Sequence, residues 1–440
     1  MDPMNTKLRI SICWFRRDLR WDDHTALWHA LQSNFPVLPI FIFDPEILSQ
    51  FPENDSRVHF IYNKLQELNK LVSIENRGIA QYYGTVESVF NHLLKEFDIQ
   101  GVYTNEDYEP ASIERDQMVS ALLSVHNIPL YSFKDQLIFA KNEVCKPDGS
   151  PYVVYTPFMK KWKENYATQK PLVHPSDSEL SKLLQMDSLP RVSMTEIELT
   201  TPTHQVESYN IDTEFLDTYA LTRNTPSIKG SVLGPHLRFG TLSIRKLVRL
   251  AYASSKQEIF LNELIWREFF SSILWHFPHT ITKSFKPAYD TIKWRNNPEE
   301  FKAWCEGKTG YPLVDAGMRE LNKTGYMHNR VRMVVASFLC KHLLIDWRWG
   351  EAYFAEKLLD YEIASNIGNW QWVAGCGVDA APYFRIFNPT EQLKKFDSDK
   401  KYIHKWVVDI NEFTYPHPIV DHSFARERCL ATYKEALSVI

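Results

Sequence analysis

The segment NELIWREFF combines a carboxylate, an indole and a guanidinium at helical spacing. On an α-helix, positions i, i+3, i+4 and i+7 share one face, and here they hold Glu263, Trp266, Arg267 and Phe270. A surface Glu–Arg pair beside a half-buried tryptophan would explain this pattern. The alternative is one wall of a polar, aromatic cavity, in which the indole stacks on a flat ligand and the carboxylate accepts hydrogen bonds. The spacing by itself leaves both explanations open.

A second segment, GYMHNRVRMVVASF, carries arginines into an apolar helix. Asn329, Arg332 and Met333 share a helical face, and Arg330 lies on the neighbouring one. Solvated arginines on a helix are common, but an unpaired charge that enters a core is prohibitive. An inward arginine therefore needs a carboxylate, and Asp360 in LLDYEIASN is the candidate partner.

Two tryptophans in GNWQWVAG must face nearly opposite ways. Trp370 and Trp372 are two residues apart, which is about 200° around a helix. One of them could face a ligand cavity while the other faces the protein body. Two core tryptophans would fit the same pattern, and periodicity does not separate the two hypotheses.

The stretch TPSIKGSVLGPHLRFGTLS has the composition of a ligand-binding turn. Gly230 and Gly234 allow close approach of the backbone, and Thr225 and Ser231 supply hydroxyl groups. Backbone N–H groups in such a turn can hold phosphate. A simple interhelical loop explains the pattern equally well and is the more common case.

The elements that must position these residues fall into two kinds. In the first third of the chain, apolar runs predict strands and amphipathic runs predict helices in alternation, which is typical of a parallel sheet with helices on both faces. The expected strands are Leu8–Phe15, Val37–Asp44, Ile79–Gly84, Gly101–Asn105 and Leu130–Lys134, and the expected helices are Asp23–Leu31, Ser56–Leu71, Val86–Phe97 and Pro110–Val125. The first strand is not followed by GxGxxG or GxxxxGK[ST], which argues against a dinucleotide or ATP site of the usual kind.

The rest of the chain has little strand signal. Residues 136–205 are rich in turn sequences such as KPDGSP and KPLVHPSDSE, and we expect a long connection with short helices there. From about residue 210 the apolar residues recur with the helical period, which predicts an all-α unit. We therefore expect three parts: an α/β domain (1–135), a connector (136–205) and a helical domain (206–440).

Composition narrows the class of protein. The chain has 440 residues, of which 44% are hydrophobic and 14% aromatic, and a formal net charge of −4. A nucleic-acid site would therefore have to be a local basic patch. The six cysteines have no CxxC spacing, so we expect no metal site and no disulfide framework. The absence of a signal-peptide pattern and of a membrane-spanning apolar stretch favours a cytoplasmic protein without membrane contact.

Five segments together resemble the photolyase/cryptochrome family, and most closely its class I cyclobutane pyrimidine dimer photolyases: WFRRDLRWDDHTAL, GSPYVVYTPFMKKW, NELIWREFF, GYMHNRVRM and DYEIASNIGNWQWVAGCGVDAAPYFRIFNP. The resemblance implies an α/β antenna domain with a Rossmann-like parallel sheet, and an all-α domain that binds FAD. It also implies an enzyme that acts as a monomer and flips damaged pyrimidines out of DNA. Reduced FAD excited by blue light then donates the electron that splits the dimer.

The resemblance also implies residue roles. The cofactor-binding residues would be Tyr219, Ser231, Val232, Leu233, Gly234, Pro235, Arg332, Asp360, Glu362 and Asn366, with Asn366 facing flavin N5. The residues that contact DNA or the lesion would be Arg223, Glu263, Trp266, Arg267, Asn329, Arg330, Met333 and Trp372. Catalysis would use Glu263 on the pyrimidine edge and Asn366 at the flavin, while Trp294, Trp347 and Trp370 pass an electron from the surface to the flavin.

Some positions depart from the family pattern or separate its branches. Relatives usually carry Thr-Ser before Arg-Leu-Ser-Pro, whereas this chain has GSVLGP, so its phosphate contacts would depend more on the backbone. A cryptochrome photoreceptor is the main alternative, but Asn366 is the photolyase residue where plant cryptochromes carry Asp and insect ones Cys, and no long tail follows the helical domain. A (6-4) photolyase is disfavoured because His328-Asn329 replaces its His-His pair and Met333 replaces a further His. Relatives of the DASH type usually carry Tyr at the position of Trp372.

A second, antenna chromophore is left open by the sequence. The segment HTITKSFK does not reproduce the Cys-Lys-His pattern of folate binders, although Glu106 and Lys283 could still serve. Folate, deazaflavin, a flavin and an empty site all remain compatible with these residues.

Overall fold

The computed structural model describes residues 7–72 and 76–438. Residues 1–6, on which part of the signal-peptide prediction falls, lie outside the described residues. The chain forms two compact units that are discontinuous in sequence: Met1–Ala140 with Gln169–Glu207 and Pro235–Leu250, and Lys141–Thr168 with Ser208–Gly234 and Ala251–Ile440. Residues of the predicted connector are thus divided between the two units.

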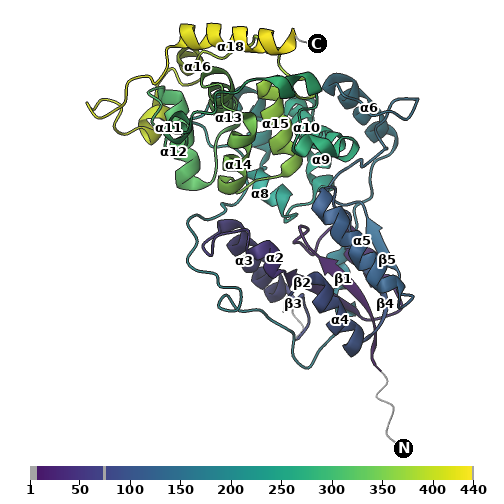
Figure 1. The fold of residues 1–440 in the computed structure, drawn as a ribbon. Helices are drawn as coiled ribbons and strands as arrows, with labels where there is room; N and C mark the ends of the chain where they lie inside the picture. Colours follow the sequence, from purple (N-terminus) through teal and green to yellow (C-terminus); the bar gives the residue numbers. More distant parts are fainter. Residues whose placement is uncertain (1–6, 73–75, 439–440) are drawn as a thin grey trace, which may run out of the picture. The chain divides into compact units, whose positions relative to one another are not determined.

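The first unit contains a five-stranded parallel sheet in the order β3-β2-β1-β4-β5 (Figure 1). Its strands are β1 (Arg9–Phe15), β2 (Val37–Phe43), β3 (Ala80–Tyr83), β4 (Asp98–Asn105) and β5 (Leu130–Phe133). Its principal helices are α1 (Thr25–Leu31), α2 (Pro45–Leu48), α3 (Ser56–Leu71), α4 (Val86–Glu96) and α5 (Pro110–Ser124). Strand–helix alternation is therefore confirmed element by element. Only β4 begins clearly earlier than predicted, because Asp98 and Ile99 pair with β1 before a register shift.

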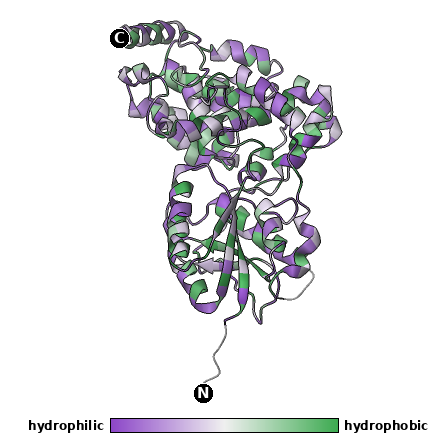
Figure 2. Ribbon diagram, turned by 90° about the vertical axis from the view of Figure 1, so that its right-hand side faces the viewer, coloured by the Kyte–Doolittle hydropathy of each residue, from purple (hydrophilic) through white to green (hydrophobic). Residues whose placement is uncertain are grey.

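The sheet has a buried apolar layer on each face. Cys13, Phe15 and Leu27 belong to the layer under α1 and α3, whereas Ile12 and Phe90 belong to the layer under α4 and α5. Figure 2 shows the strands as largely hydrophobic ribbons and the surrounding helices as mixed. This is the pattern of a sheet that is covered on both faces.

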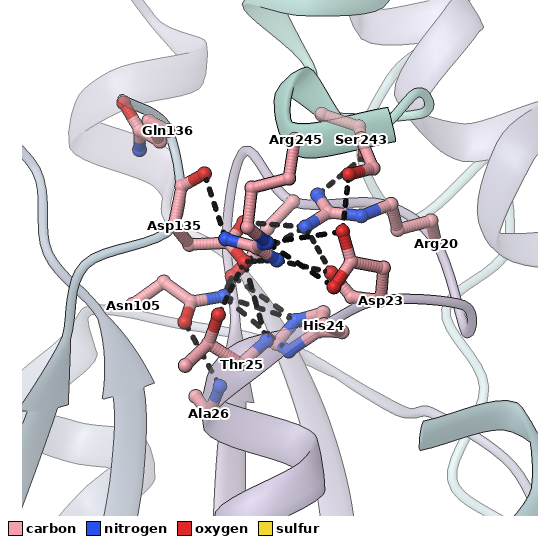
Figure 3. A network of polar contacts seen from close by, with 12 residues as sticks. Arg20, Asp23, His24, Thr25, Ala26, Asn105, Asp135, Gln136, Ser243 and Arg245 are labelled. Carbon is pink, nitrogen blue, oxygen red and sulfur yellow. Dashed lines mark hydrogen bonds and ion pairs between the residues drawn. The ribbon is translucent and has the colours of Figure 1, made fainter. Parts of the chain in front are cut away.

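The segment WFRRDLRWDDHTAL contributes to a buried polar network in the first unit (Figure 3). Arg20 Nη2 lies 2.7 Å from Asp135 Oδ2, and Arg245 Nη2 lies 2.8 Å from Asp135 Oδ1. Arg245 also pairs with Asp23, which accepts a hydrogen bond from Ser243. Burial alone would raise the pKa of Asp135, but the two arginines hold it well below its usual value. Arg20, Arg245, Asp23 and Asp135 are therefore each hydrogen-bonded to or paired with an opposite charge or a backbone carbonyl, although Arg20 Nε is buried without a partner among the described residues. The network has a structural role, because it joins the first loop to α9 (Ile244–Tyr252).

The second unit is helical, as predicted. The remaining helices of the chain are α6 (Tyr155–Thr168), α7 (Thr213–Thr222), α8 (Leu233–Arg238), α10 (Glu258–His276), α11 (Pro298–Cys305), α12 (Pro312–Thr324), α13 (Asn329–Ser337), α14 (Trp347–Lys357), α15 (Ile363–Ala374), α16 (Pro389–Phe396), α17 (Lys401–Trp406) and α18 (His422–Leu437). Short helical turns are η1 (Ser176–Lys182), η2 (Ser255–Gln257), η3 (Pro278–Ile281), η4 (Pro287–Thr291) and the π-helical η5 (Phe338–His342).

The core of the helical unit is formed by one large apolar cluster to which α12, α13, α14 and α15 contribute. Met318, Val335, Phe354 and Trp370 are among its buried members. Packing on this scale fixes the orientation of α13 and α15, which carry several of the residues singled out by sequence. Within the described residues, no helix is long and apolar enough to cross a membrane.

Candidate functional site

Helix α10 presents its polar face to two separate partners. Glu263 Oε1 lies 2.5 Å from Arg223 Nη1, at the C-terminal end of α7. Arg267 Nη2 donates to Glu362 Oε1 at 2.7 Å, at the start of α15. The simple surface pair between Glu263 and Arg267 is therefore not formed, and this stripe instead contacts two other elements. That outcome favours the cavity-wall interpretation.

The carboxyl group of Glu263 is in a perturbed environment. Burial raises its pKa, and this effect exceeds the opposing influence of Arg223 and Arg330. A carboxyl group with a raised pKa can donate as well as accept hydrogen bonds nearer to neutral pH. Groups with this property occur more often at functional sites than elsewhere.

Arg332 on α13 finds the predicted carboxylate. Its Nη2 lies 2.8 Å from Asp360 Oδ2, and its Nε donates to the carbonyl of Met327 at 2.7 Å. Asp360 in turn lies directly against the backbone of Gly234, since a Cβ placed on that glycine would be 2.5 Å from Asp360 Cβ. The ion pair and the glycine turn are therefore parts of one arrangement.

The turn that precedes α8 holds the remaining residues assigned to the phosphate region. Val232 has a φ of 54°, a left-handed conformation that is strained for a β-branched residue. The Ser231 carbonyl accepts the Asn210 N–H at 2.9 Å, and Leu233, Gly234 and Pro235 form the start of α8. Local strain of this kind is often found at ligand-binding turns.

Tyr219 lies on α7 close to this region of the helical unit. Its ring makes an edge contact with Phe260 at 5.2 Å between centroids, and the guanidinium of Arg223 lies 5.8 Å from its ring centre. Arg223 therefore contacts both Tyr219 and Glu263, which joins the α7 and α10 sides of the site.

Asn366 on α15 is held by a residue that the sequence analysis did not identify. Its Nδ2 donates to Glu351 Oε1 at 2.9 Å and to the Glu351 carbonyl at 3.2 Å. Burial raises the pKa of Glu351, opposed by hydrogen bonds from Asn366 and Tyr361. Because the amide NH₂ is engaged in this way, the orientation of the amide oxygen is fixed. Within the described residues, no donor contacts that oxygen.

The exposed end of α13 carries Asn329, Arg330 and Met333. Arg330 donates from Nε and Nη2 to Asn224 Oδ1, at 3.1 and 2.7 Å. Burial lowers the pKa of Arg330, and the charges of Arg223 and Arg385 lower it further. Three guanidinium groups therefore lie close enough to influence one another.

Arg385 and Glu351 are two charged site residues that sequence reasoning missed. Arg385 lies inside the segment FRIFNP, and Glu351 lies in the helix that begins at Trp347. Both are in quoted or neighbouring segments, but neither has a periodic spacing to a partner. A search for charged residues beside the tryptophans could have found Glu351.

The two tryptophans of α15 differ in burial as their spacing requires. Trp370 is 2% exposed and lies in the main core cluster, whereas Trp372 is only partly buried. Trp347 is buried in the same cluster, and Trp294 packs against it from a partly buried position. The series thus runs from fully buried to partly exposed side chains.

These features define a class of protein: a parallel α/β unit joined to a helical unit that holds fixed ion pairs, an oriented amide and a graded series of tryptophans. In such an arrangement, residues position a planar ligand while the protein supplies charge and aromatic surfaces. The described residues contain no group of three or more His, Cys, Asp or Glu that could hold a metal ion.

Comparison with known proteins identifies the family. Residues 11–176 match the DNA photolyase family model, and residues 260–414 match the FAD binding domain of DNA photolyase. The deoxyribodipyrimidine photo-lyase of Vibrio cholerae serotype O1 is 36% identical, with 97% of this chain and 99% of the relative covered. The chain therefore belongs to the photolyase/cryptochrome family and carries its FAD-binding domain.

Solved structures agree with this assignment. A bacterial class III photolyase from Agrobacterium tumefaciens has a TM-score of 0.83 and 32% identity, covering 99% of each chain. An archaeal photolyase from Sulfolobus tokodaii, solved with two FAD molecules, has a TM-score of 0.77 and 33% identity, covering 97% of this chain and all of the other. A Synechocystis cryptochrome shares the fold, with a TM-score of 0.84 at 24% identity and coverage of 98% of this chain and all of the other. Membership of class I in particular stays a prediction.

Proposed function

We propose that this chain is a deoxyribodipyrimidine photo-lyase that uses FAD and blue light to split cyclobutane pyrimidine dimers in DNA. The observation that carries the proposal is the face of α10. It carries a partly buried carboxyl group with a raised pKa, Glu263, on the same helical face as an aromatic platform, Trp266, beside a basic cluster. Curated relatives of this name, such as that of Escherichia coli at 34% identity over 97% of this chain, support the activity.

The residues of the helical unit fit FAD. The pair formed by Arg332 and Asp360 presents both a donor and an acceptor to the polar edge of a flavin ring. The amide oxygen of Asn366 is held in one orientation by Glu351 and can accept from a flavin N–H. The turn from Ser231 to Gly234 offers backbone N–H groups to the phosphates. When bound and reduced, FAD supplies the light-excited electron.

The basic cluster is the proposed DNA contact. Arg223, Arg330 and Arg385 concentrate positive charge on a chain whose formal net charge is −4. Guanidinium groups bind phosphate oxygens and set the position of the strand without reading its sequence. Damaged pyrimidines stack and pair poorly, so moving them out of the duplex costs less than moving intact ones. Trp266 and Trp372 would then receive the flipped pair by stacking.

Glu263 would act on the flipped pyrimidines. Its carboxyl group would form a hydrogen bond with the pyrimidine edge and stabilise the radical anion that forms once the electron arrives. Arg223 holds the carboxyl group in place before the lesion enters. The roles of Trp294, Trp347 and Trp370 as carriers of an electron toward the flavin rest on their graded burial and on the family resemblance.

The compartment, the oligomeric state and the domain division of the chain are also proposals. All six cysteines are free thiols, which suits a reducing cytoplasm, and we propose a cytoplasmic monomer. We keep the division into an antenna domain (1–135), a connector (136–205) and a catalytic domain (206–440) as a functional proposal. Extraction of chromophores from the purified protein will identify whether a folate, a deazaflavin, a second flavin or no second chromophore accompanies FAD.

The test compares binding and repair. Binding curves for an oligonucleotide with one cyclobutane dimer and for its undamaged twin, at one salt concentration, give the discrimination ratio. Trp266→Ala should cost about 1–3 kcal/mol of affinity for the damaged strand through lost stacking, and leave undamaged binding nearly unchanged. Glu263→Gln should leave FAD bound and lower the repair yield per absorbed photon.

Trp28→Ala is the matched control, since Trp28 is a partly exposed tryptophan on α1 in the α/β unit. This variant should behave like the wild-type protein in both assays. If the wild type shows no preference for the dimer and no light-dependent repair, the proposal is wrong and a cryptochrome photoreceptor takes its place.

A further inference from the structure

The helix α6 is packed along α10, the helix that carries Glu263 and Trp266. Its first residue, Tyr155, lies flat on the indole of Trp266, with ring centroids 3.6 Å apart and an angle of 6° between the ring planes. The Tyr155 hydroxyl donates to the carbonyl of Asn262 at 2.8 Å. Tyr155 is thus joined to α10 by its ring and by its hydroxyl group.

Other contacts hold Tyr155 in this position. Its backbone N–H donates to Asp379 Oδ2 at 3.1 Å. One turn further, Phe158 packs on Phe269 with centroids 5.2 Å apart. Near the middle of α6, Trp162 Nε1 donates to the buried carboxylate of Glu268 at 2.6 Å. Helix α6 is therefore fixed to the back of α10 along most of its length.

The Tyr155 ring covers one face of the Trp266 indole, and no base can enter between two rings that are already in van der Waals contact. A base that stacks on Trp266 would therefore use the opposite face. Phe269 and Phe270 also lie beside the indole, at 5.5 and 5.4 Å between ring centroids. The stack also restrains χ2 of Trp266, the side-chain torsion that orients the indole. In an isolated tryptophan this torsion has a broad distribution. A platform that is already oriented loses less conformational entropy when a base stacks on it.

We propose that Tyr155 is a positioning residue for lesion recognition, which fixes the plane of Trp266 and leaves a single face for the flipped pyrimidine. This inference rests on the proposed function of Trp266. It assigns to the segment GSPYVVYTPFMKKW a role in substrate selection through α10, in addition to its packing.

The experiment measures the discrimination ratio, that is, affinity for a dimer-containing oligonucleotide divided by affinity for its undamaged twin. Tyr155→Leu should lower this ratio by roughly 5-fold, the lower end of what loss of one base–aromatic stack costs. Tyr155→Phe keeps the ring and should stay within about 2-fold of the wild type. Bound FAD, measured by its absorbance, should be unchanged in both variants.

Two further variants separate positioning from general packing. Phe158→Leu shortens an aromatic contact of the same helix that does not touch Trp266, so it should lower the melting temperature and leave the ratio unchanged. In a Trp266→Ala background, Tyr155→Leu should cause no further loss of discrimination. If Tyr155→Leu does not fold, Tyr155→Met, which fills a similar volume without a planar ring, takes its place.

The inference is overturned if removal of the Tyr155 ring leaves the ratio unchanged, or if the loss persists undiminished without Trp266. The wild-type measurements keep this failure distinct from failure of the proposed function. A wild type that prefers the dimer and repairs it supports that function whatever the Tyr155 variants do.

Discussion

Replacing Gly234 by serine, the residue that relatives usually carry in this turn, should weaken FAD binding in this chain. A Cβ on Gly234 would lie 2.5 Å from Asp360 Cβ and 2.6 Å from Asp360 Oδ2. Both distances are well below van der Waals contact, so Asp360 has to move. Because Asp360 is paired with Arg332, that movement disturbs the ion pair proposed to hold the flavin ring.

The expected cost follows from two limits. Overpacking of a well-packed site costs about 1–3 kcal/mol, and complete loss of one partner from a buried ion pair costs about 3–5 kcal/mol. The lower range applies if Asp360 shifts but keeps its contact with Arg332. Rotation of the Asp360 side chain would relieve only the contact with Oδ2, whereas the contact with Cβ needs a backbone shift. FAD-free protein can accept that shift, but the bound state needs the Asp360 carboxyl group in place. The cost should therefore fall on FAD affinity, as an increase of about 5- to 150-fold in the dissociation constant.

The assay is fluorescence titration of apoprotein with FAD, accompanied by thermal melting with and without the cofactor. Gly230→Ala is the matched control in the same turn, because its Cβ would meet only the Tyr326 hydroxyl, at 3.0 Å. It should change FAD affinity by less than Gly234→Ser does. If Gly234→Ser binds FAD as tightly as the wild type, Asp360 does not need its present position, and its assignment to the flavin site is refuted.

Three further predictions concern electron supply, DNA and acid stability. Trp347→Phe should slow photoreduction of oxidised FAD and spare repair by enzyme reduced beforehand, and equal loss of both would indicate a structural role instead. Binding of dimer-containing DNA should weaken steeply with salt, and Arg330→Gln should reduce the salt slope by about 1, more than Arg223→Gln does; affinity independent of salt would contradict this. Burial lowers the pKa of His342 to about 3. As the pH falls below about 6.5, this histidine therefore becomes protonated in the unfolded chain while it stays neutral in the native chain. The free energy of unfolding then decreases by about 1.4 kcal/mol per pH unit. Denaturant midpoints at pH 7 and 5.5 should therefore differ less in His342→Gln than in the wild type, and an equal difference would refute this role.

Sequence patterns were sufficient for the α/β unit because its signals are local. Apolar alternation and caps fix where a strand or helix begins, and α3 (Ser56–Leu71) has the predicted bounds at both ends. The helical period predicted from about residue 210 onward does not reveal that α13 ends at Ser337 and that a π-helical turn follows. A π-helical turn has a longer period than an α-helix, but this one has only 5 residues, which is too short for the apolar pattern to show the change.

For the site, sequence indicated which residues carry charge but rarely which partner each one takes. The pairing of Arg332 with Asp360 was predictable, since a core helix with an inward arginine requires a carboxylate. The partners of Glu263 and Arg267 were not, because each is joined to an element distant in sequence. Such contacts depend on how the helices pack against one another, and the residue spacing within one helix does not predict this packing.

The ion pairs also bear on how a chain with a formal net charge of −4 could contact DNA through the proposed basic cluster. Arg332 and Arg267 are each neutralised by a carboxylate, and Arg223 shares its charge with Glu263. Arg330 differs, because the side chain that it contacts most closely, Asn224, is a neutral amide. Its charge is therefore not cancelled by a contacting carboxylate and stays available for a phosphate, which is why its removal should change the salt dependence most. In the proposed site, these ion pairs would keep the residues around the flavin and the lesion close to neutral overall, and groups held in fixed orientations would meet the negative charge that develops on the substrate.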